Sequence, residues 1–169
     1  PTVSIDGNFV LASANGNTWT AIYTVQQGDT QGAAAYEISS ISDLAGNTTA
    51  TITASGAVTI DTVDPTPVTI DLEAISDTGS SDTDNVTRDD TPSLSGDAGN
   101  ASSVEIFDGV NSLGAGILNG ATWSLTTGSL SDGDHTLTVV ASDAAGNTTT
   151  SSALVITIDT DAPDVPTID

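Results

Sequence analysis

The sequence lacks cysteine altogether and has almost no basic residues. Its 169 residues include no Cys, no Met, one His, one Arg and 23 acidic residues, which gives a formal net charge of −22. The absence of Cys excludes disulfides, thiol chemistry and Cys-ligated zinc. Nucleic acids and anionic membrane surfaces both require clusters of Lys and Arg, so we expect neither as a partner.

Long apolar runs are also missing. No stretch of 18 apolar residues occurs, so we expect no transmembrane helix and no insertion into a membrane. The sequence predicts no signal peptide. Because it begins at Pro1 within a strand-like run, we expect it to be a piece of a longer polypeptide.

What the sequence does contain is one stretch that occurs twice. SDLAGNTTATITASGAVTIDTVDP, which ends at Pro65, recurs as SDAAGNTTTSSALVITIDTDAP, which ends at Pro163. NGNTWT around Trp19 likewise recurs as NGATWS around Trp123. The copies lie roughly 100 residues apart, a period that indicates tandem domains of one type.

The second copy, residues 65–163, predicts a complete all-β unit. Thr, Ser, Val and Gly abound, and short alternating runs are separated by Gly, Asn and Asp turns. We expect a two-residue hairpin at Asn119-Gly120 with φ > 0 at both positions. The pattern predicts an immunoglobulin-like sandwich without the Cys…Trp…Cys of antibody domains, with seven strands at 68–72, 91–96, 104–107, 112–117, 122–126, 135–142 and 152–158.

The first copy, residues 1–64, is shorter, and residues 164–169 read as the start of a further repeat. Counted back from Trp19, the first copy begins near the third strand and lacks the first two, which would leave an open edge and core. Either another chain supplies the missing part of this unit, or the unit is stable only in its packed form. In the alternative, residues 2–5 form a first strand of a smaller variant. The expected strands are 2–5, 10–13, 19–25, 34–41 and 49–60, with turns at Asp6-Gly7 and Asn15-Gly16.

Catalysis has little support in this sequence. The single His135 is expected at a strand end rather than as a general base, and we expect no enzyme. Trp19, Ala21, Tyr23 and Val25 alternate onto one face, which favours a sandwich core over a sugar-stacking platform.

Calcium is the functional hypothesis with the most chemical content. Ca²⁺ prefers carboxylate, amide and carbonyl oxygens. Seven-strand topology places the linker before the second unit beside its 97–102 and 143–147 loops. At the opposite end, the 76–90 loop (with Asp77) meets the 130–134 turn and the outgoing linker. The alternative is a set of solvated acidic loops. The expected ligands are Asp61, Asp64, Asp97, Asp143 and Asn147 at the first end, and Asp82, Asp84, Asp132, Asp134, Asp159 and Asp161 at the second.

These segments resemble a known family along essentially the whole chain. VDPTPVTIDL, SSDTDNVTRDDTPSLSG, NGATWS and LSDGDHTLTVVASDAAGNTT are similar to the bacterial immunoglobulin-like repeats of giant type I-secreted, biofilm-associated adhesins. The resemblance implies a calcium-stiffened extender array outside the bacterial cell, with neighbouring repeats as partners. It implies linker and loop roles for Asp61, Asp97, Asp143 and Asp159. Asp97-Ala-Gly-Asn100 departs from the Glu-containing loop of many such repeats.

Two other functions remain open from the sequence. The chain could be a glycan- or protein-binding module, or an accessory domain of a secreted carbohydrate-active enzyme. Similar acidic linkers at both ends of the second unit favour the spacer. A binding module would be expected to carry an aromatic or basic cluster in one set of loops, and the sequence contains none.

Overall fold

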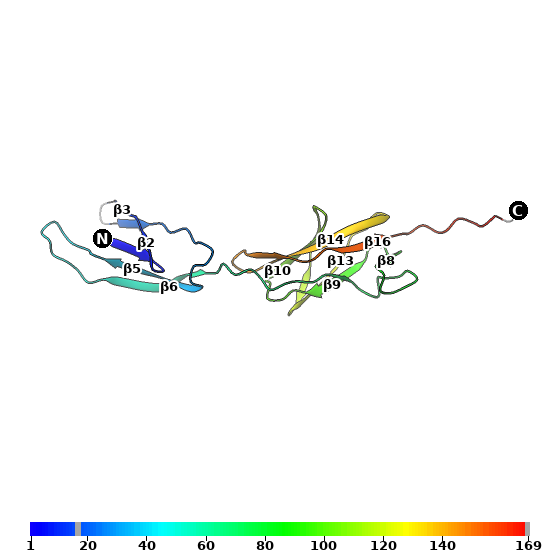
Figure 1. The fold of residues 1–169 in the computed structure, drawn as a ribbon, viewed down its shortest axis with the longest axis horizontal. Coiled ribbons are helices and arrows are strands. Elements are labelled where there is room, and N and C mark those ends of the chain that lie inside the picture. Colours follow the sequence, from blue (N-terminus) through cyan, green and yellow to red (C-terminus); the bar gives the residue numbers. More distant parts are fainter. Residues whose placement is uncertain (16–17, 168–169) are drawn as a thin grey trace. The chain divides into compact units, whose positions relative to one another are not determined.

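The computed structural model describes residues 1–15 and 18–167, apart from the side chain of Ala57. The regular structure in these residues is entirely β, which confirms the expected fold class. The described part of the chain contains no helix of the length and apolarity needed to cross a bilayer. The chain divides into two compact units, Pro1–Val63 and Asp64–Asp169 (Figure 1).

The second unit is a sandwich of two sheets. One has the strand order β11-β10-β14-β16-β8, with β15 also paired to β14, and the other has the order β12-β13-β9-β7. The strands are β7 (Asp71–Leu72), β8 (Val86–Thr87), β9 (Ser93–Asp97), β10 (Ser103–Asp108), β11 (Asn111–Ala115), β12 (Ile117–Asn119), β13 (Thr122–Thr126), β14 (Gly133–Ser142), β15 (Thr148–Thr150) and β16 (Leu154–Ile158).

One predicted strand is shortened in the structure, another is divided, and the predicted 76–90 loop contains the short strand β8. The predicted first strand, 68–72, is regular only in β7, and the chain crosses to the other sheet as β8, which pairs parallel with β16. The predicted strand 112–117 was wrong as one element. Its first part, β11, pairs with β10, whereas its last residue begins β12, which pairs with β13. Gly116 at this change of sheet lies so close to Val104 and Trp123 that a side chain would collide with them.

Other predicted boundaries shift by a few residues. The predicted strand 152–158 is β16 from Leu154, preceded by the separate β15. Asn119 pairs with Thr122, so the hairpin turn consists of Gly120-Ala121 rather than Asn119-Gly120. Of the two turn residues only Gly120 has a positive φ, 65°, as a type II′ turn requires.

The core of the second unit forms where alternate side chains of the two sheets meet. Twelve buried apolar residues form one cluster, and Trp123 on β13 is its largest member, with 1% of its surface exposed. The Trp123 indole N–H donates to the Thr69 carbonyl oxygen at 3.0 Å. The first strand therefore satisfies the one polar atom of the largest core side chain.

Gly96 makes this contact possible. It pairs with Trp123 across β9 and β13, and a Cβ at this position would overlap the Thr69 carbonyl oxygen. Thr69 N–H donates to the Asp97 carbonyl at 3.1 Å, and Asp97 N–H donates to the Thr69 hydroxyl at 2.8 Å. Through these bonds, the part of the predicted strand 68–72 that precedes β7 also lies beside β9.

The first unit has the same strand arrangement in part. Its main sheet has the order β2-β1-β5-β6, and β3 and β4 form a separate hairpin. The Asp6-Gly7 turn is confirmed, with φ of 49° and 80°. The predicted strand 10–13 is divided between two strands, and Gly16 of the predicted Asn15-Gly16 turn lies outside the described residues. The strands are β1 (Thr2–Ile5), β2 (Asn8–Val10), β3 (Ala12–Asn15), β4 (Thr18–Ala21), β5 (Gly32–Ser39) and β6 (Ile52–Ile60).

The two hairpins that carry the Trp residues have the same register. Ala14 faces Trp19 and Asn15 faces Thr18, just as Leu118 faces Trp123 and Asn119 faces Thr122. In the second unit the other edge of β13 pairs with β9. No described strand pairs with β4 besides β3. The sheet that contains β9 and β7 in the second unit is thus represented in the first unit by one hairpin.

We expect Gly96→Ala to destabilise the second unit by about 1–3 kcal/mol, because the added methyl group overlaps the Thr69 carbonyl and crowds the indole of Trp123. Urea unfolding followed by far-ultraviolet circular dichroism measures the loss. Gly128→Ala is the matched control, since no atom lies within 4 Å of its Cβ position, and it should change stability by less than about 0.5 kcal/mol. Equal effects of the two substitutions would contradict this role of Gly96.

Candidate functional site

The chain is held by side chains where it leaves each unit. In the first unit, Gln31 accepts a hydrogen bond from Thr62 N–H and donates one to the Thr62 hydroxyl, both at 2.8 Å. In the second, Asp132 accepts from Thr160 N–H at 3.2 Å and from the Thr160 hydroxyl at 2.9 Å. Thr62 and Thr160 occupy the same position in the repeated stretch. Each unit therefore fixes the second linker residue beyond its last strand through a side chain that binds both the N–H and the hydroxyl of that Thr.

The neighbouring Asp of each linker also serves the backbone. Asp61 accepts a hydrogen bond from Val63 N–H, and Asp159 accepts one from Asp161 N–H, both at 3.1 Å. A side-chain carboxylate that binds the backbone two residues on mimics a turn and restricts the local conformation. The two linkers thus begin with the same local structure.

The second unit also fixes the chain that enters it. The Thr66 N–H donates to the Asn100 side-chain oxygen at 2.7 Å, and the Asn100 N–H donates to the Thr66 hydroxyl at 3.3 Å. The Thr149 hydroxyl donates to the Pro65 carbonyl at 2.7 Å. The 97–102 loop and β15 therefore hold the segment that leads to Thr69 and the Trp123 contact.

The repeated DxAGN loop is a self-contained turn. In the second unit, Asp143 Oδ1 accepts backbone N–H bonds from Ala145, Gly146 and Asn147, and Oδ2 accepts one from the Asn147 side chain. The bond from the Asn147 side chain, with the backbone bonds, holds the pKa of Asp143 below its usual value. Asp43 makes the corresponding bonds to residues 45 and 47 in the first unit. The observed role of this carboxylate is to hold its own loop.

The acidic loop between β7 and β8 contains one unusual oxygen. Asp77 is 5% exposed; its Oδ2 accepts a hydrogen bond from Asn85 N–H at 3.1 Å, whereas its Oδ1 is buried without a hydrogen-bond partner. A buried carboxylate oxygen without a donor is costly, so such an atom calls for a counter-ion or water. Asp77 is the residue of this loop whose environment fits a cation.

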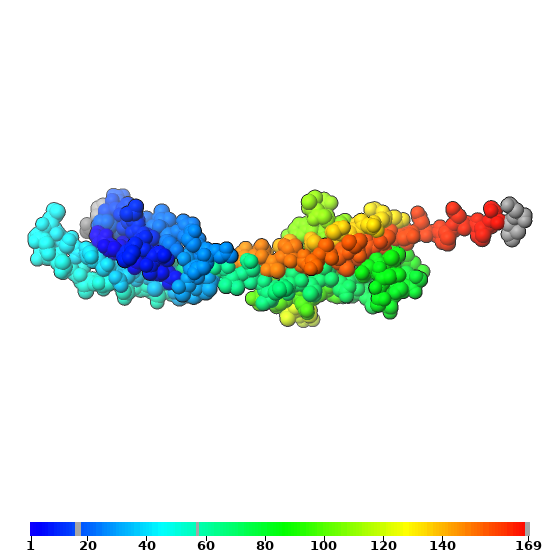
Figure 2. All heavy atoms as spheres, in the orientation of Figure 1, coloured from blue at the N-terminus to red at the C-terminus, as the bar shows by residue number. Residues whose placement is uncertain are grey.

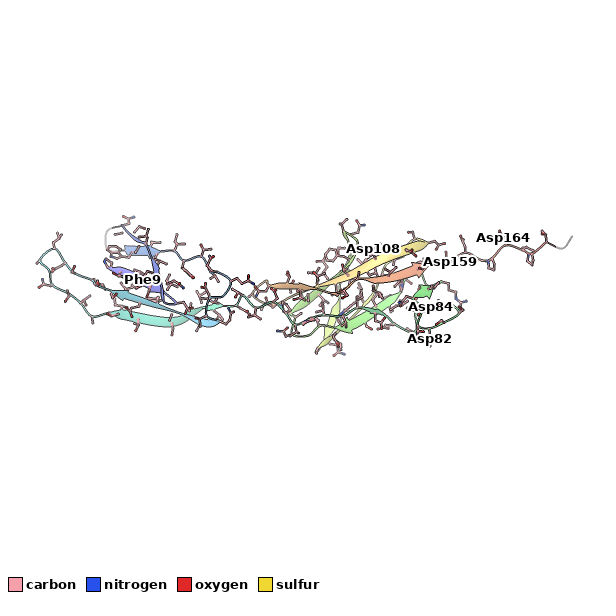
Figure 3. The ribbon with its side chains drawn as sticks, in the orientation of Figure 1. Phe9, Asp82, Asp84, Asp108, Asp159 and Asp164 are labelled. Atoms are coloured by element: carbon pink, nitrogen blue, oxygen red, sulfur yellow. The ribbon has the colours of Figure 1, made fainter. Side chains whose placement is uncertain are left out.

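The other predicted ligands at this end lie on the surface. Figure 3 shows Asp82 and Asp84 on the loop before β8 and Asp159 directly after β16, at one end of the second unit. Asp84 Oδ1 accepts from Val86 N–H at 3.2 Å, and Asp134 accepts from the Thr157 hydroxyl at 2.7 Å. Within residues 1–15 and 18–167, no three His, Asp or Glu side chains are grouped to hold a metal. The 76–90 loop and the outgoing linker do adjoin, since Asp159 N–H donates to the Thr87 carbonyl at 2.8 Å.

The predicted ligands at the other end have varied settings. Asp64 and Asp97 are exposed, and Asp61 belongs to the first unit, so a shared cation among them stays a prediction. Asn100, which the sequence placed near this group, uses its side-chain oxygen to bind Thr66. The expected start of a further repeat at 164–169 falls partly outside the described residues. The segment after β16 continues as extended chain beyond the sheets of its unit (Figure 2).

The imidazole ring of His135 is held between a carboxylate and a backbone carbonyl. Its ring lies 2.7 Å from Asp108 Oδ2 through Nδ1 and 2.8 Å from the Ser131 carbonyl through Nε2. Both partners are acceptors, so the arrangement is complete when both ring nitrogens carry protons. Burial lowers the pKa of His135, but the bonds to Ser131 and Asp108 outweigh it and raise the pKa above its usual value. The ring joins β14 to β10 and to the preceding turn.

The first unit contains an open apolar cleft of about 700 Å³. Its lining includes Val3 of β1, Tyr36 and Ile38 of β5, and Trp19 of β4. Of the described apolar side chains in this unit only Val3 and Ile60 are buried, and Trp19 is 48% exposed. The expected sandwich core around Trp19 was therefore wrong for this unit, although it is confirmed for Trp123.

Sequence reasoning overlooked the linker clamps of Gln31 with Thr62 and of Asp132 with Thr160. The Asp-Thr pair that occurs in both linkers was the available signal. The residues that bind the two Thr side chains, a Gln and an Asp, differ in type and share no sequence motif. No local pattern in the sequence distinguishes Asp77 from the other acids of its loop, because its burial arises only in the three-dimensional structure.

Comparison with known proteins agrees with this architecture. A family model described as bacterial Ig-like domain matches residues 64–160. No curated protein matches the chain significantly. The matched segment coincides with the complete sandwich, the hydrogen-bonded segment that enters it and the start of the linker that leaves it. Because this segment spans more than half of the chain, the chain belongs to the bacterial Ig-like domain family.

Proposed function

We propose that this chain is a structural spacer of a bacterial surface adhesin, in which Ig-like repeats follow one another in series and Ca²⁺ stiffens the array. The observation that carries the proposal is the clamping of linker residues. Thr62 and Thr160 are held by their own units, and Thr66 is held where the second unit begins. Linker residues that are fixed in this way restrict the direction of the chain at both ends of the second unit, which a spacer requires.

In this proposal the protein is extracellular, supports adhesion or biofilm formation, and has no catalytic role. Its partners are the neighbouring repeats of the same polypeptide. The linkers contain no Gly-Ser run; they carry Pro65 and Pro163, which limit the conformations available to the backbone. Together with the hydrogen-bonded Asp and Thr residues, these prolines favour stiff connections over flexible ones.

Calcium enters the proposal through charge and through Asp77. A net charge of −22 with one Arg destabilises a compact chain by self-repulsion. Ca²⁺ accepts about six to eight oxygen ligands, including carboxylates, backbone carbonyls and water. The partnerless Oδ1 of Asp77 supplies a buried anionic ligand, and Asp82 and Asp84 lie on the same loop. Further cations at the Asp61 and Asp159 linkers would stiffen the array in the same way.

Calcium should raise the thermal midpoint of the second unit more than ionic screening does. At a hundred-fold excess over Kd, one site adds about 2.7 kcal/mol. The measurement is thermal unfolding in EDTA, in millimolar CaCl₂ and in NaCl of matched ionic strength. Asp77→Asn should reduce the calcium-dependent shift, whereas the exposed control Asp164→Asn should retain it in full. A shift that NaCl reproduces, or one that is undiminished in Asp77→Asn, would contradict a site at Asp77.

The stiffness of the linker can be tested separately. Because the chain has no Cys, Leu44→Cys and Val110→Cys, both at highly exposed positions, give one dye site in each unit. We expect Gln31→Ala to broaden the single-molecule energy-transfer distribution, because it frees Thr62. Gln26→Ala is the matched control, since that side chain bonds only to carbonyls of its own turn. A wild-type distribution as broad as that of Gln31→Ala would contradict the spacer.

A further inference from the structure

The strand through which the chain leaves the second unit is bonded directly to a strand near the start of that unit. The chain leaves through β16, and β16 pairs with β8 in parallel, with Thr157 opposite Val86 and Ile158 opposite Thr87. Every other strand pair among the described residues is antiparallel. The β8–β16 pair therefore has a geometry that no other described pair shares.

Backbone hydrogen bonds join these two strands at both ends of the pair. The Thr157 N–H donates to the Asn85 carbonyl at 2.8 Å, and the Asp159 N–H donates to the Thr87 carbonyl at 2.8 Å. The bonds of a parallel pair are evenly spaced along the strands. The second of these bonds lies where β16 passes into the outgoing linker, so the linker begins at a residue that the pair holds.

The short strand β8 is also anchored to the loop that precedes it. The Asn85 N–H donates to Asp77 Oδ2 at 3.1 Å, and the Thr78 and Thr87 hydroxyls lie 2.9 Å apart. The Thr87 hydroxyl also donates to the Ser76 carbonyl, and Thr87 is buried. Although β8 has only two residues, these contacts make it a fixed part of the unit.

Tension between the two ends of the polypeptide acts on the β8–β16 pair in shear. The pull of the preceding chain passes through β7 and reaches β8 at its N-terminal end, beside Asn85. The pull of the following chain reaches β16 at its C-terminal end, beside Asp159. Because the strands are parallel, the two pulls act in opposite directions along one axis, and the bonds between the strands have to break together.

We propose that the β8–β16 pair resists tension and keeps the second unit folded when the polypeptide is pulled from both ends. This inference rests on the proposed spacer function, because a spacer between a cell and the surface to which it adheres is pulled in this way. β16 cannot leave the sandwich in the direction of the pull without breaking its bonds to β8 as well as those to β14. The pair determines the strength of the unit under load, whereas the linker residues determine the direction of the chain.

Removal of one hydrogen-bond donor from the pair tests the proposal. The full chain is held by handles at both ends in EDTA, and its unfolding is followed at constant force. The second unit is recognised by its larger increase in contour length, because it contains more residues than the first. We expect Asp159→Pro to unfold about tenfold faster than Asp159→Ala, because both lack the carboxylate but only proline lacks the N–H that binds Thr87.

The direction of pulling gives a second test that leaves the pair unchanged. Because the chain has no Cys, Ile75→Cys and Arg88→Cys, both at exposed positions, give attachment points before and after β8. Each is combined with a handle at the end of the chain after β16. The attachment before β8 loads the pair in shear, whereas the attachment after β8 opens it from one end, one bond at a time. We expect a lower unfolding force from the Arg88 position.

Either of two results overturns the proposal. One is an equal unfolding force from the two attachment points, and the other is an equal unfolding rate of Asp159→Pro and Asp159→Ala under load. Such a result together with a narrow distribution of linker distances would remove the tension-resistant pair and leave the spacer intact. A broad distribution of linker distances together with direction-dependent unfolding would contradict the spacer alone.

Discussion

The contact between the Trp123 indole and the Thr69 carbonyl is the constraint on which the rest of this structure depends. It requires strand residues 68–72 to lie across β9 and β13, and Gly96 leaves the space for that approach. The same segment continues backward to Thr66 and Pro65, which Asn100 and Thr149 hold. The closure of the core and the fixing of the incoming linker are therefore one arrangement. The internal packing of this domain is thereby linked to the path of the chain that enters it.

The repeat makes the first unit a natural comparison for this constraint. Its hairpin register, its DxAGN loop and its outgoing clamp follow the second unit, yet it has no strand beside β4 other than β3 among the described residues. The result is a half-exposed Trp19 and an apolar cleft in place of a core. Among the described residues, the exposure of Trp19 thus follows from the missing strand neighbour of β4 and not from the register of its hairpin.

Much of this fold could be predicted from the sequence, because alternation and turn residues are local signals. The alternation of apolar and polar residues located β13, the turn residues located the Asp6-Gly7 turn, and the repeat located the two Trp hairpins. The change of sheet at Gly116 and the crossing of residues 72–86 to β8 depend on contacts distant in sequence, so no local pattern revealed them. The site was harder still. Only its burial distinguishes Asp77 from its acidic neighbours, and the sequence did not indicate that the Asp143 carboxylate holds its own loop.

The central claim is that covering strands, and not hairpin sequence, decide whether each Trp hairpin of this chain is stably packed. Amide hydrogen exchange on the full chain alone tests it most directly, by comparing β4 with β13 under one set of conditions. Amides of covered strands open only with the unit, whereas those of an uncovered hairpin open locally. The account predicts that β13 amides exchange orders of magnitude more slowly than β4 amides. Equal protection of the two strands in the monomeric chain would contradict it.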